Sequence, residues 1–345
     1  MAERPELLSG SCGTDPARIM DEMSRLSYLS RAIHVAADLE IADIIGQNSL
    51  SAAEIAERAG LHAASLARVL RFMSAYGVFS DVERGKFRNT ALSDVLRRDS
   101  PVSIRPNLRR IGGAWWKAIG NLEHSLKTGE SAFTDANDAS FFEYLAGNPE
   151  QQSRFDEGMA QISDADDGAI AEAYDFSKFG KIIDVGGGRG GLLVQILSRA
   201  ADACGVLFDQ AQVVEGATRL EQPGLLNRCE LVGGDFFASV PSGGDCYIIK
   251  GVLHDFSDEQ CASILSNCRK QVSNDGAVLV ADRILPSSKD GPHPNLTMDV
   301  QMMILLSGRE RTSEEWREIF GHAGLQMVGV HDTTVDFSIV EGVPG

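Results

Sequence analysis

From Lys181 onward, short apolar runs alternate along the chain with longer stretches that have the spacing of amphipathic helices. Each run is bounded by glycine or polar residues, which is typical of a strand buried in a parallel sheet. The alternation predicts an α/β fold with a doubly wound, Rossmann-like sheet. The runs are residues 182–185, 206–208, 230–232, 246–249 and 277–281, followed by 326–330 and 337–340, which are close enough to pair as an antiparallel hairpin.

The N-terminal part of the chain has helical spacing. Asp15 and Pro16 have the residue types of a helix N-cap and a first helical position, and apolar residues then recur on one face as far as Leu39. That face carries more apolar surface than a solvent-facing helix needs, so we expect it to pack against a partner subunit. Residues 1–14 are polar, and we expect them to form a mobile N-terminus.

Residues 50–98 have the pattern of a winged helix. A serine-capped helix ends at Gly60, a second helix spans residues 63–76, and two short strand-like runs flank a glycine turn. Such a module either reads DNA with its second helix or serves a structural, dimerising role. Basic residues in this segment are opposed by Asp81, Glu83 and the acidic remainder of the chain, which favours the dimerising role.

Residues 101–175 have helical patterns without alternation. Phe155 and Met159 fall on one helical face, where they either fill a core or border a flat substrate pocket. The predicted organisation is a mobile N-terminus (1–14), an all-helical and winged-helix domain (15–100), a helical linker that contributes to the substrate pocket (101–175) and a Rossmann-like domain (176–345).

The composition and charge of the chain argue against nucleic-acid, metal and membrane binding. The formal net charge is −17 and the isoelectric point about 4.8, which disfavours a nucleic-acid partner. The six cysteines have no zinc-ligand spacing, so we expect reduced thiols and no metal centre. The N-terminus lacks a signal-peptide pattern, and no apolar run has the length of a membrane span. We therefore expect a cytoplasmic protein without membrane contact.

A glycine loop follows the first strand of the Rossmann-like domain. Asp184 precedes Gly186, Gly188 and Gly191, a spacing at which the backbone turns tightly and comes close to a nucleotide. The same spacing fits the dinucleotide fingerprint. At this point both NAD and S-adenosylmethionine are candidate ligands.

Later strands also end in residues that suit a nucleoside, and ligands bind at the carboxyl ends of such strands. Asp209 ends the second strand, where a carboxylate accepts hydrogen bonds from ribose hydroxyls. Asp235 and Phe236 follow the third strand and suit the amino group and the ring of adenine. Lys250 ends the fourth strand, and His254 follows it at the nucleotide end of the sheet.

Taken in order, these segments resemble the S-adenosylmethionine-dependent O-methyltransferases of the plant caffeate type (class I) and their bacterial relatives in antibiotic and pigment biosynthesis. The resemblance covers nearly the whole chain and is carried by Asp-Val-Gly-Gly-Gly-x-Gly, Gly-Gly-Asp-Phe-Phe, Leu-His-Asp-Phe-Ser-Asp-Glu and Gly-Arg-Glu-Arg-Thr. It implies a homodimer formed through the N-terminal helices. It also implies S-adenosylmethionine as the cofactor and S-adenosylhomocysteine as the product.

The resemblance implies that the residues matching the family motifs hold the cofactor, and one more contact comes from the helix before the sheet. Together with the acid and the glycine that belong to these motifs, the expected cofactor-binding residues are Ser163, Asp184, Gly186, Asp209, Gly234, Asp235, Phe236 and Lys250.

His254 is the expected general base. A phenol is mostly protonated at neutral pH, and histidine has a suitable pKa for accepting its proton. The family places acids at the positions matching Asp282 and Glu310, and one of them orients the imidazole. The sequence leaves open which acid does so. We expect no metal, because Asp255 and the acids after it have the pattern of a turn and a helix start.

The acceptor is expected to be an aromatic small molecule with a hydroxyl group, such as a phenol, a phenazine or a polyketide. Methionine-rich walls adapt to flat rings. The alternatives are a relative that binds the same cofactor but performs a hydroxylation, a DNA-binding regulator and, more distantly, an NAD dehydrogenase. The expected substrate-binding residues are Trp115, Phe155, Met159, Asp255, Met302 and Met303, with Trp116 and Leu306 beside them.

Overall fold

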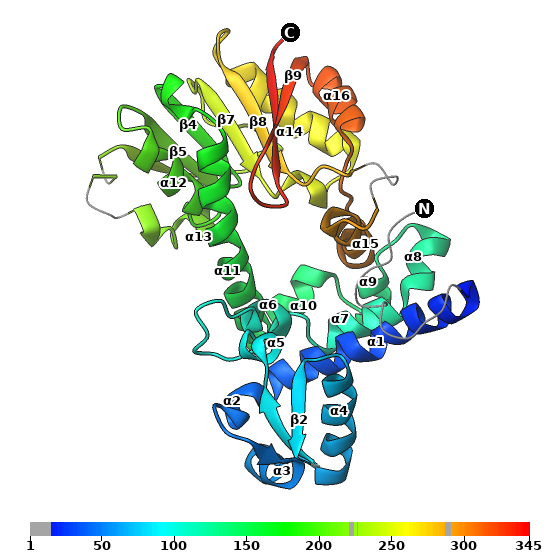
Figure 1. Cartoon of the computed structure of the whole chain (residues 1–345). Coiled ribbons are helices and arrows are strands. Elements are labelled where there is room, and N and C mark those ends of the chain that lie inside the picture. The colour runs from blue at the N-terminus through cyan, green and yellow to red at the C-terminus, as the bar shows by residue number, and fades with distance from the viewer. Residues whose placement is uncertain (1–14, 84, 221–223, 226, 287–290) are drawn as a thin grey trace. The chain divides into compact units, whose positions relative to one another are not determined.

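The computed structural model describes residues 15–83, 85–220, 224–225, 227–286 and 291–345 (Figure 1). The chain divides into two compact units, Met1–Gly113 with Asn148–Gln161, and Ala114–Gly147 with Ile162–Gly345. Residues from the expected linker, 101–175, belong to both units. The expected mobile N-terminus, 1–14, lies outside the described residues.

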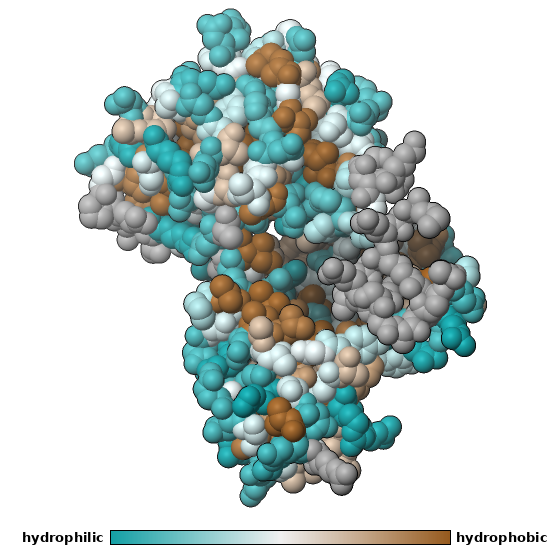
Figure 2. Space-filling view, viewed as in Figure 1, coloured by the Kyte–Doolittle hydropathy of each residue, from teal (hydrophilic) through white to brown (hydrophobic). Residues whose placement is uncertain are grey.

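The first unit begins with helix α1 (Pro16–Asp38). The Asp15 carboxylate accepts a hydrogen bond from the Ala17 amide at 3.1 Å, so the predicted N-cap is confirmed. Hydrophobic side chains reach the surface of this unit in patches (Figure 2). On α1 the exposed apolar residues include Met20, Met23 and Tyr28.

The predicted winged helix is confirmed. Helices α3 (Ala52–Ala59) and α4 (Ala63–Ala75) pack with an antiparallel sheet of order β1-β3-β2. Ser51 and Glu54 form a capping box at the start of α3, which fixes where that helix begins. The remaining elements of this segment are α2 (Ile41–Ile45), β1 (Leu50–Ser51), β2 (Phe79–Glu83), β3 (Lys86–Asn89), α5 (Ala91–Asp94) and α6 (Arg105–Arg109).

Four short helices open the second unit, and their aromatic side chains form its local core. Phe141 meets Trp115 and Phe133 edge to face, with ring centroids 5.6 and 5.3 Å apart. The Ser131 hydroxyl donates to the carbonyl of Leu305 at 2.8 Å and so joins these helices to α15 (Pro294–Leu306). The helices are α7 (Gly113–Gly120), α8 (Leu122–Thr128), α9 (Ala132–Asn137) and α10 (Phe141–Gly147), and α11 (Pro149–Ala173) runs through both units.

A seven-stranded sheet with the order β6-β5-β4-β7-β8-β10-β9 forms the centre of the second unit (Figure 1). Strands β4 to β8 pair in parallel, and β10 pairs antiparallel with both β8 and β9. The doubly wound sheet and the C-terminal hairpin are therefore confirmed. The strands are β4 (Lys181–Val185), β5 (Cys204–Asp209), β6 (Cys229–Gly233), β7 (Cys246–Lys250), β8 (Ala277–Asp282), β9 (Leu325–Asp332) and β10 (Ser338–Pro344).

Apolar side chains are buried on both faces of this sheet in two separate clusters. Two-sided burial explains why the parallel strands are almost continuously apolar in sequence. The helices between and after the strands are α12 (Gly191–Arg199), α13 (Ala211–Val214), α14 (Asp258–Gln271), α15 (Pro294–Leu306) and α16 (Ser313–His322), with 3₁₀ turns η2 (Phe176–Lys178), η3 (Thr218–Leu220) and η4 (Leu253–Asp255).

The strand order places a topological switch beside β4. The chain leaves β4 to form β5 on one side and later returns to form β7 on the other side. The carboxyl ends of these three strands therefore lie together at one edge, which is where open α/β sheets bind ligands.

Two further expectations concern thiols and membranes. The cysteines in the described part of the chain are all free, and Cys12 lies outside it. Among the described helices, none combines the length and the hydropathy that a membrane span requires.

Packing at Gly342 gives a first prediction. A methyl group there would lie closer to the buried Phe320 ring than van der Waals contact allows. We expect Gly342→Ala to lower the free energy of unfolding by about 1–3 kcal/mol, as overpacking does. Chemical denaturation of the purified protein would measure it.

Gly321 provides the matched control. It lies in α16, and a methyl group at this position meets nothing within 4 Å. Gly321→Ala should keep or raise the stability by up to about 1 kcal/mol, because alanine favours helix. Equal destabilisation by both substitutions would contradict the packing argument.

Candidate active site

The glycine loop after β4 provides an open backbone cradle. Gly186 and Gly188 have positive φ angles of 69° and 59°, which favour glycine. The Gly188 amide donates to the Asp209 carboxylate at 2.9 Å, so the end of β5 holds the loop in place. A side chain at Gly186 would collide with Val252, whereas the space beside Gly188 is open. The loop backbone at Gly188 can therefore come close to a bound ligand, because no side chain stands between them.

Asp184 lies beneath this loop and has no exposed surface. A methyl group at Gly187 would come within 2.5 Å of its carboxylate. Neither carboxylate oxygen has a hydrogen-bond partner among the described residues. Burial, together with the nearby negative charge of Asp167, raises the pKa of Asp184 to about 7. The expected contact of Asp184 with the cofactor stays a prediction.

Lys250 ends β7 beside the loop and is held by helix α11. Its ammonium donates to the Ser163 hydroxyl at 3.0 Å and forms an ion pair with Asp167. Ser163 and Lys250 were predicted from the sequence, whereas Asp167 was not. The available signal was its position on the same helix, one turn after Ser163, where both side chains share a face.

The expected adenine-binding segment follows β6. The Gly234 amide donates to the Asp209 carbonyl at 2.9 Å, and a methyl group at Gly234 would overlap the ring of Phe208. Asp235 is exposed. Phe236 meets Phe256 edge to face with centroids 5.9 Å apart. An exposed carboxylate thus stands beside an aromatic cluster, an arrangement that fits a polar flat ring.

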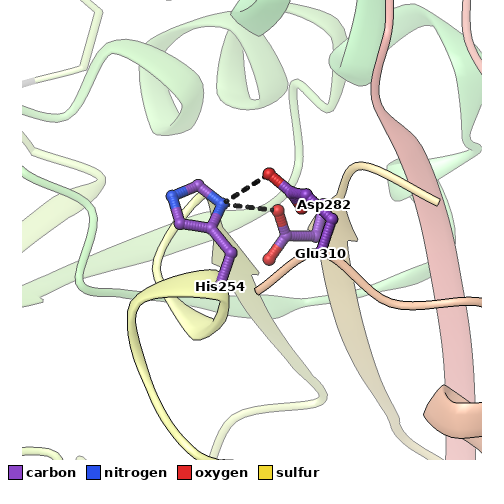
Figure 3. A group of neighbouring side chains, drawn as sticks. All are labelled: His254, Asp282 and Glu310. Carbon is purple, nitrogen blue, oxygen red and sulfur yellow. Dashed lines mark hydrogen bonds and ion pairs between the residues drawn. The ribbon is translucent and has the colours of Figure 1, made fainter. Parts of the chain in front are cut away.

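His254 lies in the 3₁₀ turn η4, with its Nδ1 atom directed at two buried acids (Figure 3). Nδ1 is 2.9 Å from Oδ1 of Asp282 and 3.6 Å from Oε1 of Glu310. The geometry therefore gives the hydrogen bond to Asp282, a choice that the sequence left open. The other ring nitrogen, Nε2, lies on the side away from these acids and is 3.6 Å from Oδ1 of Asp255.

Charges around the imidazole outweigh its burial. Burial alone would lower the pKa of His254, but the carboxylates of Asp282, Glu310 and Asp255 raise it to about 9. Burial would raise the pKa of Asp282, yet the attraction and hydrogen bond of His254 hold it below its usual value. Burial and the charge of Asp282 raise the pKa of Glu310 to about 8. Asp282 is thus the ionised partner of the imidazole.

The loop that carries His254 is clamped by residues of the Gly-Arg-Glu-Arg-Thr segment. Arg311 has no exposed surface and donates to the carbonyls of Leu253 and Phe256 at 3.1 and 2.7 Å. The Arg309 amide donates to the His254 carbonyl at 2.9 Å. From this segment only Glu310 was predicted as a site residue, and the role of Arg311 in holding the loop was not predicted.

His254, Asp282 and Glu310 also offer one nitrogen and two carboxylate oxygens that lie within 4.8 Å of one another. Such a donor set also suits a divalent cation. The absence of a metal from this site stays a prediction.

The expected acceptor residues fall in both compact units. In the second unit, Trp115 and Met302 are buried, Met303 is half-buried, and Asp255 lies beside His254. Phe155 and Met159 belong to the part of α11 in the first unit. The structure thus brings Asp255 to the imidazole, and the joint pocket remains a prediction.

The chain is similar to known proteins over most of its length. Residues 119–326 match the model of an O-methyltransferase domain, and residues 22–99 match that of an O-methyltransferase dimerisation domain. The chain is 38% identical to a phenazine O-methyltransferase of Lysobacter antibioticus over 92% of its own length and 93% of the relative's length.

Solved structures agree with this result. A mitomycin 7-O-methyltransferase has a TM-score of 0.86 at 32% identity, over 95% of this chain and 98% of that one. An O-methyltransferase from neocarzinostatin biosynthesis, in complex with S-adenosylmethionine and 2-hydroxy-5-methyl naphthoic acid, has a TM-score of 0.80 at 33% identity, over 92% and 96% of the two chains.

The electrostatics of His254 can be measured directly. In the wild-type protein, NMR titration should give His254 a pKa near 9. In Asp282→Asn the pKa of His254 should fall by at least about one unit. The negative charge that offsets the effect of burial on the imidazolium is then lost. Glu310→Gln should have a smaller effect, since its carboxylate is farther from Nδ1. A larger shift in Glu310→Gln would contradict the assignment of Asp282 as the main partner.

Proposed function

Because the chain belongs to the S-adenosylmethionine-dependent O-methyltransferases, in the branch that contains bacterial natural-product enzymes, we propose that it methylates a hydroxyl group of an aromatic small molecule with His254 as general base. The observation that carries the role of His254 is its hydrogen bond to the buried Asp282, which leaves Nε2 directed away from both acids.

The cofactor is S-adenosylmethionine, which supplies a methyl group activated by a sulfonium. The residues at the carboxyl edge of the sheet fit it chemically, because an open glycine cradle adjoins carboxylates, an aromatic ring and a lysine. In this proposal Asp209 accepts the ribose hydroxyls, Asp235 and Phe236 take the adenine, and Ser163 and Lys250 hold the methionine end. Gly186 and Gly234 keep the backbone close, and Asp184 acts from beneath the loop.

The proposed mechanism assigns one task to each member of the histidine cluster. Nε2 of His254 accepts the proton of the acceptor hydroxyl. The Asp282 carboxylate keeps the proton on Nδ1 and thereby fixes the tautomer that leaves Nε2 free to accept. It also stabilises the imidazolium that forms. Glu310, 3.6 Å from Nδ1, adds negative potential where its carboxyl is ionised, at pH values above its raised pKa of about 8.

Base catalysis accounts for only part of the expected rate. A positioned general base contributes about 10²- to 10⁴-fold. Alignment of the two reacting groups can contribute about 7–11 kcal/mol. Positioning therefore contributes more, and a protein without the imidazole should keep residual activity.

The acceptor class is inferred from the pocket residues and the relatives. Relatives are named for phenazine, mitomycin and hydroxybenzoate methylation. In this chain, Trp115, Phe155, Met159, Asp255, Met302 and Met303 are the proposed acceptor contacts. Large apolar and thioether side chains suit a flat ring, and Asp255 beside the imidazole suits a polar substituent.

A mass-spectrometric screen tests this function. The protein and S-adenosylmethionine would be incubated with phenols, phenazines and aromatic polyketides, with and without a chelator. A product carrying an added methyl group, formed equally with chelator, supports metal-free O-methylation. Addition of oxygen would indicate a hydroxylase instead, and loss of activity with chelator would indicate that the reaction requires a metal.

Replacing the imidazole gives a sharper prediction. His254→Ala should lower kcat at least ~100-fold and leave the affinity for S-adenosylhomocysteine, measured calorimetrically, nearly unchanged. In wild type the rate should rise with pH towards about 9, because only unprotonated His254 accepts a proton. His322→Ala, at an exposed position of α16, is the control. An unchanged rate in His254→Ala would exclude the imidazole as base.

We also propose a homodimer formed through the N-terminal helices. The match to a dimerisation domain and the exposed apolar residues of α1 support it. Sedimentation should give twice the mass of one chain. Met20→Glu combined with Met23→Glu should weaken association, because each places a charge in an apolar interface. Glu57→Lys, which changes an exposed residue on α3, should leave association unchanged. If both variants associate equally strongly, the proposed role of α1 is contradicted.

A further inference from the structure

An ion pair that the sequence did not predict lies at the edge of the glycine loop. The side chains of Lys250 and Asp167 are 13% and 5% exposed, and Ser163 completes the group through its bond to the lysine. Removing two charges from water is costly, and the cost is repaid only when the geometry is good and further hydrogen bonds compensate the charges.

The second oxygen of Asp167 faces the start of helix α12. A methyl group on Gly191, the first residue of this nine-residue helix, would overlap that oxygen. The preceding residue, Gly190, has no side chain with which to cap the helix. The positive end of α12 and the Lys250 ammonium thus form an anion site, which the carboxylate of Asp167 occupies.

Negative charge exceeds positive charge around this pair. Asp167 faces Lys250, Asp164 and Arg219, and Arg219 is itself paired with Asp164. Asp166 lies near Lys250, Arg283, Asp167 and Asp336. Below them, Asp184 is buried with no hydrogen-bond partner in the described structure and faces Asp167, Lys250 and Asp209. Burial raises the pKa of Asp166, of Asp167 and of Asp184.

A ligand that suits this site must bring both an anion for Lys250 and a cation with N–H donors for the acids. An α-amino acid has both groups on one carbon. The cofactor carries such a group at its methionine end, and its adenosine end alone does not.

We propose that Asp167 is the positioning residue that binds the ammonium of the cofactor's amino acid, whose carboxylate takes over Lys250 and the start of α12. This inference rests on the cofactor assignment made above. In the structure, Lys250 and Asp167 each compensate the charge of the other; in the proposed complex, the carboxylate and the ammonium of the ligand would do so instead. The pair makes the site selective for cofactor molecules with an intact amino acid.

The test compares two ligands that share the adenosine thioether. S-Adenosylhomocysteine carries the amino acid, whereas 5′-methylthioadenosine lacks it. Asp167→Asn should weaken S-adenosylhomocysteine binding about 10- to 100-fold in calorimetry, the expected loss of a charged hydrogen bond. It should leave 5′-methylthioadenosine binding unchanged. Glu157→Gln, which removes an exposed acid elsewhere on the same helix, should alter neither.

Proton release provides a second readout. An ammonium placed beside Asp167 and Asp184 favours their ionised forms, so S-adenosylhomocysteine should release protons from wild type near pH 7. Titrations in buffers of different ionisation enthalpy measure this release. The number of protons released should be smaller in Asp167→Asn than in wild type. In Asp167→Glu, which keeps the charge, it should be close to the wild-type number. These comparisons use folded protein, verified by its thermal transition.

Two results with Asp167→Asn would overturn the inference, and one result with wild type would overturn the proposed function. Unchanged or tighter S-adenosylhomocysteine binding in Asp167→Asn would make Asp167 a competitor for Lys250. Equal weakening of both ligands would give it a purely structural role. If wild type binds neither ligand, the proposed function itself fails; if wild type binds both and only the variant behaves unexpectedly, the inference about Asp167 alone fails.

Discussion

The parallel pairing of β5, β4 and β7 is the constraint on which the functional site depends. Their register sets Asp184 opposite Leu207 on one side and Ile248 on the other, so the three strands end together. Because parallel strands present their carboxyl ends at one edge, the glycine loop, the acid after β5 and the lysine after β7 converge without any contact encoded between them in sequence. The hydrogen bond from the loop to the acid then fixes the shape of the cradle.

Buried carboxylates give this edge its electrostatic character. Asp167, Asp184, Asp282 and Glu310 are all nearly inaccessible to water, where charge is costly unless a cation lies close by. Asp167 and Asp282 each have such a cation, Lys250 and His254 respectively. The carboxylate oxygens of Asp184 and Glu310 have no hydrogen-bond partner in the described structure, and the pKa of each carboxyl is raised. The site therefore combines held cations with excess acid, which suits a cofactor that carries positive charge.

Local patterns predicted the elements well and the contacts less well. The strands of the sheet, the N-cap at Asp15 and the winged helix depend on neighbouring residues, and all of them are confirmed. The division into compact units depends on contacts between distant segments. The sequence pattern of the expected linker, residues 101–175, does not reveal these contacts, and the linker residues belong to both units. Asp167 and Arg311 went unrecognised because their significance lies in partners far away in the chain.

The sequence by itself determined the fold class, the family motifs and the residue types available at the ends of the strands, since periodicity and spacing are properties of adjacent residues. Only the tertiary structure decided that Asp282 rather than Glu310 bonds His254, and that Asp167 pairs with Lys250. The physical reason is distance: a hydrogen bond needs about 3 Å. Differences of less than 1 Å between competing acids are set by how β8, α11 and the loop after α15 pack, not by their order along the chain.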